Sequence, residues 1–151
     1  MKRSVVASVG LLASGVALAD NLEGADRLLC APEQIMICVE DAECYPAHGS
    51  ELGVPDFLII DLKNKKMQTT KASEQTRTTA FSTMSRVGGK IFLQGIENGR
   101  AFSFLINEAT GSLTVAVSRD GVAVAAFGSC TNAMVELRRR RHMHYTRPSA
   151  I

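Results

Sequence analysis

The segment that decides the fold spans residues 87–130 and reads VGGKIFLQGIENGRAFSFLINEATGSLTVAVSRDGVAVAAFGSC. Apolar and polar residues alternate along most of it, and turn residues interrupt the alternation at Asn98-Gly99, at residues 107–111 and at Asp120-Gly121. Alternation with a period of two is typical of half-buried strands. Asn-Gly between two such runs predicts a two-residue hairpin, because a type I′ turn needs positive φ at both central residues. The segment therefore predicts four antiparallel strands joined as a meander.

The Asn98-Gly99 turn also sets the register of its hairpin. With these residues in the loop, Glu97 lies opposite Arg100 as a charge pair. Gly95 lies opposite Phe102, whose ring can cover the bare backbone. The same reasoning at Asp120-Gly121 extends the alternation to the second hairpin. The face predicted to be buried consists of Ile91, Leu93, Phe102, Phe104, Ile106, Leu113, Val115, Val117, Val124 and Ala126.

The beginning of the chain, residues 1–19, is typical of a secretory signal peptide. Lys2 and Arg3 precede a short apolar run, and Ala17-Leu18-Ala19 forms a small-x-small cleavage site. The apolar run is shorter than the roughly 20 residues of a membrane span. We therefore expect an exported product with a β-domain at residues 20–130, a basic and disordered tail at residues 131–151, and no transmembrane segment after cleavage.

The charges of the expected product are segregated along the chain. Without Lys2 and Arg3 the 17 basic residues become 15, which equals the 15 acidic residues. Residues 131–151 hold five arginines and one glutamate, a net charge of +4, so residues 20–130 carry −4. The run of Arg138, Arg139, Arg140 and Arg141 is a candidate contact for an anionic surface, such as lipid headgroups or an acidic envelope protein. The alternative is a solvated end without a partner.

The chain before the meander predicts further short strands. Residues 34–39 and 56–62 are apolar and β-prone, and residues 67–71 are expected to return beside the latter strand. Residues 77–86 are rich in Thr and Ser and predict an edge strand, whereas residues 45–55 contain two prolines and two glycines and predict a loop. About eight short strands without a crossover helix predict an all-β fold, a single small antiparallel barrel or sandwich with meander connections.

Four cysteines in an exported chain predict two disulfides, for which three connectivities are possible. Cys38 and Cys44 bracket a polar turn and can face one another across a hairpin. Cys30 and Cys130 then remain, and a bond between them would join the first and last strands of the domain. A zinc or redox site needs closely spaced ligands such as C-x-x-C, which the sequence lacks. We therefore predict the pairs Cys30–Cys130 and Cys38–Cys44.

The sequence offers little catalytic chemistry. His48 is followed by Gly-Ser-Glu51, but adjacency is not triad geometry and no G-x-S-x-G elbow is present. His142 and His144 alternate in the tail, but a third metal ligand is missing. No phosphate-binding glycine loop or dinucleotide fingerprint occurs. We expect no enzymatic activity, no cofactor, no bound metal and no nucleic-acid partner.

Five short motifs carry a resemblance to a protein family: FLIID at residues 57–61, LQGIENGR at 93–100, TG at 110–111, DG at 120–121 and FGSC at 127–130. This pattern resembles small exported proteins of proteobacteria with no assigned function, over residues 29–132. The resemblance implies a compact β-domain and brings no catalytic residues, and the arginine-rich tail departs from it. A looser similarity of size, export and disulfides connects the chain with periplasmic β-barrel inhibitors of lysozymes or proteases.

These observations predict a periplasmic or secreted, non-enzymatic β-domain that binds an unidentified ligand or associates with the cell envelope. Two alternatives make different structural demands. An inhibitor would present an exposed loop to an enzyme cleft, with residues 45–55 as the candidate. A lipocalin-like carrier of a small apolar ligand would enclose an apolar cavity in a closed barrel.

Overall fold

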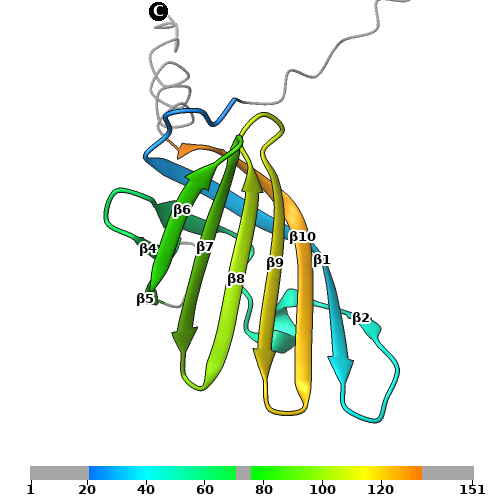
Figure 1. Ribbon diagram of the computed structural model, residues 1–151. Coiled ribbons are helices and arrows are strands. Elements are labelled where there is room, and N and C mark those ends of the chain that lie inside the picture. The colour runs from blue at the N-terminus through cyan, green and yellow to red at the C-terminus, as the bar shows by residue number, and fades with distance from the viewer. Residues whose placement is uncertain (1–20, 71–75, 134–151) are drawn as a thin grey trace, which may run out of the picture.

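The computed structural model describes residues 21–70 and 76–133. The predicted signal peptide, the arginine run 138–141 and the histidines of the tail lie outside these residues. Within them the chain forms ten strands and one short 3-10 helix (Figure 1). The elements are β1 (Arg27–Val39), β2 (Tyr45–Ala47), η1 (Gly49–Leu52), β3 (Leu58–Asp61), β4 (Lys66–Thr69), β5 (Thr78–Ala80), β6 (Thr83–Val87), β7 (Lys90–Glu97), β8 (Arg100–Asn107), β9 (Ser112–Arg119) and β10 (Val122–Asn132).

All ten strands in the described residues belong to a single antiparallel sheet. The strand order is β5-β4-β3-β1-β10-β9-β8-β7-β6, and β2 pairs separately with β1. The sheet curls into a half-barrel, so that β3, β4 and β5 lie behind the layer formed by β6 to β10 (Figure 1). The prediction of an all-β, antiparallel, barrel-like domain is confirmed.

The predicted meander and its register are confirmed. Asn98 and Gly99 have φ values of 50° and 73°, as the type I′ turn requires. Glu97 pairs with Arg100, and Gly95 pairs with Phe102. A Cβ at Gly95 would overlap the Phe102 ring, so the glycine makes room for the aromatic side chain. Eight of the ten residues predicted on the inner face are buried. Val117 and Val124 are only half-buried.

One predicted strand is in fact two. Residues 77–86 were expected to form one edge strand, but β5 and β6 are separated at Phe81-Ser82 and lie at opposite edges of the sheet. The backbone N–H of Phe81 donates to the Lys65 carbonyl (2.8 Å), whereas the N–H of Ser82 donates to the Gln94 carbonyl (2.8 Å). The two edges of the half-barrel therefore meet at this point. The physical reason is the aromatic side chain in this Thr- and Ser-rich run, because Phe81 turns inward and is buried.

The second correction concerns residues 45–55, which are not a simple loop. They form β2, which pairs with β1, and then η1. Ile35, Met36 and Ile37 of β1 supply the backbone partners of β2. Together with the division of residues 77–86, this short strand raises the strand count above the predicted eight.

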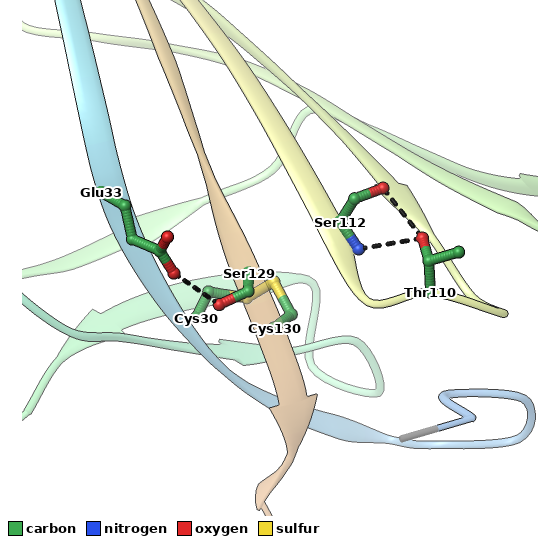
Figure 2. Close-up of a disulfide and its surroundings, with 6 residues drawn as sticks. All are labelled: Cys30, Glu33, Thr110, Ser112, Ser129 and Cys130. Atoms are coloured by element: carbon green, nitrogen blue, oxygen red, sulfur yellow. Dashed lines mark hydrogen bonds between the residues drawn. A yellow bond between two sulfur atoms is a disulfide. The ribbon is translucent and has the colours of Figure 1, made fainter. Parts of the chain in front are cut away.

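A bend in β1 and β10 allows the sheet to curl. The register between these strands shifts between Pro32 and Gln34, which leaves Glu33 in a bulge. Gly128 lies opposite Pro32, and a Cβ at this glycine would overlap the Ala31 carbonyl oxygen. On the outer side of the bend, the Ser129 hydroxyl donates to Glu33 Oε1 at 2.8 Å (Figure 2). The bulge and the glycine allow the backbones of β1 and β10 to approach closely and to bend at the same position.

Both predicted disulfides are present. Cys30 and Cys130 are direct partners in the β1–β10 register, and their bond joins the two strands beside the bend (Figure 2). Cys38 and Cys44 are bonded across the turn that follows β1, where Asp41 has a positive φ of 59°. The long bridge connects residues 100 positions apart, and the short bridge connects residues six positions apart.

One end of the half-barrel is filled by a packed core. Around the β8–β9 turn, Leu22 and Ala25 from the N-terminal segment close the interior, and the Leu22 N–H donates to the Glu108 carbonyl (2.8 Å). Arg86 forms an ion pair with the buried Glu108 carboxylate at 2.8 Å and donates to the Ala25 carbonyl. The core at this end is completed by Leu28, Ile60, Leu62, Ile91, Leu93, Ile106 and Leu113.

Candidate functional site

A cavity of about 350 Å³ occupies the other end of the half-barrel, near the β7–β8 and β9–β10 turns. Apolar side chains from both walls line it. Strands β8, β9 and β10 form one wall and contribute Phe102, Phe104, Val115, Val117, Val124 and Ala126. Strands β1, β3 and β4 form the other wall and contribute Ile37, Leu58 and Met67.

The rows of inward side chains change composition along the sheet. At the filled end, a row across the register consists of Ile91, Ile106 and Leu113, all nearly inaccessible to solvent. Two inward pairs closer to the hairpin turns, the corresponding row consists of Gly95, Phe102 and Val117, and the Phe102 ring covers Gly95. Val117 lines the cavity at the end of this row and is half-buried.

Phe102 and Phe104 line the cavity, and Phe81 packs against both of them. Phe81, Phe102 and Phe104 contact one another edge to face, with ring centroids 5.9–6.2 Å apart. Such geometry is favourable because the positive edge of one ring meets the negative face of another. The cluster also holds the corner where the two edges of the sheet meet.

Residues 49–55, called here the cover segment, lie over one side of the cavity. Leu52 and Val54 are half-buried and pack against the core, and with Pro55 they line the cavity. The segment is held locally: the Val54 N–H donates to the Gly49 carbonyl (2.8 Å), and the His48 N–H donates to Glu51 Oε2 (3.4 Å). Its apolar side chains thus face the interior of the half-barrel. His48 itself is exposed.

Charged side chains surround the opening of the cavity. Glu97, the last residue of β7, accepts hydrogen bonds from the Arg77 guanidinium and the Thr79 hydroxyl. The Arg77 hydrogen bond is the main reason that the pKa of Glu97 lies below its ordinary value, and the pKa of Arg77 is raised in turn. Because Arg77 and Thr79 come from the opposite edge of the sheet, this cluster links both edges beside the opening.

Two further arginines line the opening. Arg100 begins β8 and is half-buried, and Arg119 ends β9 and is exposed. Within residues 21–70 and 76–133, neither guanidinium forms an ion pair or a side-chain hydrogen bond. The opening therefore presents two positive side chains at the end of an apolar cavity, and Arg100 interacts with Glu97 through its charge alone.

Sequence reasoning anticipated some of these residues but not the site. It predicted the Glu97–Arg100 pairing and the inward apolar face, but not the cavity. The two hairpin registers place Arg100 and Arg119 at the same end of the meander, so the sequence could have been used to predict that these two residues lie near one another. No signal in the sequence links Arg77 or the cover segment to them.

The described residues, 21–70 and 76–133, contain no cluster of three or more His, Cys, Asp or Glu side chains placed to hold a metal ion. Glu40 and Asp41, the adjacent carboxylates of the β1–β2 turn, are exposed. Over the same residues, no helix has the length and apolar character needed to cross a membrane. Comparison of the chain with protein-family models, curated proteins and solved structures gives no match.

Proposed function

We propose that this protein is a non-catalytic binding protein that holds a small, largely apolar ligand inside the half-barrel. The single observation that carries the proposal is the cavity of about 350 Å³ with a mostly apolar lining and charged groups at its opening. Small-molecule sites have volumes of about 300–1,000 Å³ and combine apolar walls with a few polar groups that set orientation.

Two other observations support parts of this proposal. The inhibitor candidate, residues 45–55, directs Leu52 and Val54 toward the interior, which leaves fewer side chains to enter an enzyme cleft. The disulfides are typical of proteins in oxidising compartments, which supports an exported, periplasmic or secreted location. The expectation of no catalytic activity stays part of the proposal, as does a relationship to small exported proteobacterial proteins.

The test uses an uncharged fluorescent probe, N-phenyl-1-naphthylamine, whose emission rises in apolar surroundings. Purified, disulfide-bonded protein is titrated with the probe, and saturable binding at a single site is expected. Val117→Phe places a ring in the cavity and should weaken binding at least tenfold. Ser118→Phe is the matched control, because Ser118 is the exposed neighbour of Val117 on the outer face of β9 and its ring would leave the cavity open.

Thermal unfolding of both variants shows whether each one folds. Val124→Phe fills the same space from β10 and replaces Val117→Phe if the latter does not fold. Equal probe affinity in wild type and in a folded cavity-filling variant would refute binding in the cavity. Absence of saturable binding by the wild-type protein would refute the proposed function.

A further inference from the structure

We infer that the ligand is an amphiphile whose oxyanion head group binds between Arg100 and Arg119 while its apolar chain occupies the cavity. This inference rests on the proposed function, because it names the chemical class of the ligand that the cavity takes. A carboxylate is the simplest such head group, and a sulfate or phosphate ester shares its chemistry.

The β8–β9 register sets the two arginines against one another. Ala101 pairs with Ser118, so continuing the ladder by one residue places Arg100 opposite Arg119. Both side chains share the inner face with Phe102 and line the cavity. Two arginines from neighbouring strands thus line the cavity where an apolar chain would end.

Like charges placed directly opposite in a sheet destabilise it. Glu97 lies on the other side of Arg100 in the register and attracts its charge, but its carboxylate accepts hydrogen bonds from Arg77 and Thr79, which leaves the Arg100 donors free for another oxyanion. Departures from favourable pairing tend to occur at functional positions, where another interaction compensates. An oxyanion between the two guanidinium groups would supply that compensation.

The chemistry of the arginines selects the head group. A guanidinium presents a planar fork of donors that matches carboxylate and phosphate oxygens, and these charge-assisted hydrogen bonds are about twice as strong as neutral ones. The positive charge of Arg100 and Arg119 at the opening is local, and its sign is opposite to the net charge of −4 that residues 20–130 carry as a whole. The carboxylate of Glu51, which also lines the cavity, accepts the backbone N–H of His48 at 3.4 Å.

The cavity volume selects the length of the chain. A methylene group takes up about as much space as a water molecule in the liquid, roughly 30 Å³. A volume of about 350 Å³ therefore fits a chain of about ten carbons. Each buried methylene adds to the favourable free energy of transfer from water, so such a chain provides most of the affinity and the head group provides orientation.

The experiment compares ligands of equal chain length by isothermal titration below their micelle concentrations. Decanoate, decyl sulfate and decyl phosphate carry different oxyanions, decanol carries no charge, and decyltrimethylammonium carries a positive charge. We expect the anions to bind about tenfold more tightly than decanol, and the cation to bind least tightly. The order among the three anions identifies the head group. Added salt should weaken anion binding and leave decanol binding unchanged.

Charge-removing variants localise the effect. Arg100→Gln and Arg119→Gln should each weaken decanoate binding about tenfold and leave decanol binding unchanged. Lys90→Gln is the matched control, because it removes the same charge from an exposed position at the opposite end of β7. An independent readout is the thermal midpoint of the ligand-free protein, which Arg119→Gln should raise by relieving the repulsion and Lys90→Gln should leave unchanged.

The outcomes separate this inference from the proposed function. If decanol and decanoate bind with equal affinity, the cavity binds ligands but the head-group assignment is wrong. If Lys90→Gln weakens decanoate binding as much as Arg119→Gln, the attraction is long-range and the assignment is again wrong. If neither the uncharged probe nor any decyl ligand binds, the proposed function itself is refuted.

Discussion

Glu97 shows how one side chain can join distant parts of this fold. It ends β7, yet its carboxylate accepts hydrogen bonds from Arg77 and Thr79, which lie some twenty residues earlier at the other edge of the sheet. The Arg77 and Thr79 hydrogen bonds and the positive charge of Arg100 all lower the pKa of Glu97, and partial burial opposes them. The folded protein therefore favours the deprotonated form of Glu97 more strongly than the unfolded chain does.

This difference predicts a pH-dependent contribution to stability. An unfolded glutamate has a pKa of about 4.3, and the folded value is lower, so the contribution is complete above pH 4.3 and is lost as the pH falls through the folded pKa. Glu97→Gln should lower the free energy of unfolding by about 1 kcal/mol at pH 7. The difference from wild type should shrink as the pH falls below about 4.

Urea denaturation at a series of pH values from 7 to 3 measures this effect. Glu43→Gln is the control, since Glu43 is exposed in the β1–β2 turn and should give no pH-dependent difference. A Glu97→Gln difference that stays constant down to pH 3 would show that the carboxylate charge does not stabilise the fold.

At the scale of elements, β1 and β10 form the central pair. β1 is the longest strand of the described chain and pairs with β10 along its whole length, with β3 at its start and with β2 at its end. The Cys30–Cys130 bond lies within this pair and is buried. Because each neighbouring strand depends on β1, this bond stabilises the element around which the sheet curls.

The two disulfides should therefore contribute unequally. Chain-entropy reasoning assigns about 4–5 kcal/mol to a bridge that closes a loop of about 100 residues and about 2 kcal/mol to one closing a loop of about six. The double variant Cys30→Ala/Cys130→Ala should lose more stability toward urea than Cys38→Ser/Cys44→Ser. Equal losses, or a larger loss from the short bridge, would contradict this ranking.

On the scale of the whole molecule, an acidic β-domain is followed by a basic end. Residues 20–130 carry −4 and residues 131–151 carry +4. β10 ends at Asn132, and the arginine run follows beyond the described residues. The cavity and the arginine run are thus separate candidates for binding, one for a small amphiphile and the other for an extended anionic surface.

Truncation after Asn132 tests the second candidate. If the arginines contact an anionic membrane, each contributes about 1 kcal/mol near the surface. Co-sedimentation of the longer protein with anionic vesicles should then exceed that of the truncated protein at low salt. The excess should disappear near 1 M salt, where the Debye length falls from about 10 Å to about 3 Å. Equal sedimentation of both proteins would remove the arginine run from any role at such a surface.

The sequence by itself determined the meander, its register and the pairing of the cysteines. These features depend on local physics. Asn98 and Gly99 both adopt positive φ in a two-residue turn, and alternation then assigns Ile91, Leu93 and Phe104 to the buried face. Cys38 and Cys44 bracket a polar turn, and their pairing leaves Cys30 and Cys130 as the second pair.

Only the tertiary structure decided the curl of the sheet, the cavity and its charged opening. The curl depends on the close approach of Gly128 to the backbone near Pro32 and on the inward turn of Phe81. Neither event leaves a periodic pattern in the sequence. The cover segment and Arg77 reach the opening through contacts between residues far apart in the chain. Such contacts form only after the sheet has closed upon itself, so no local rule predicts them.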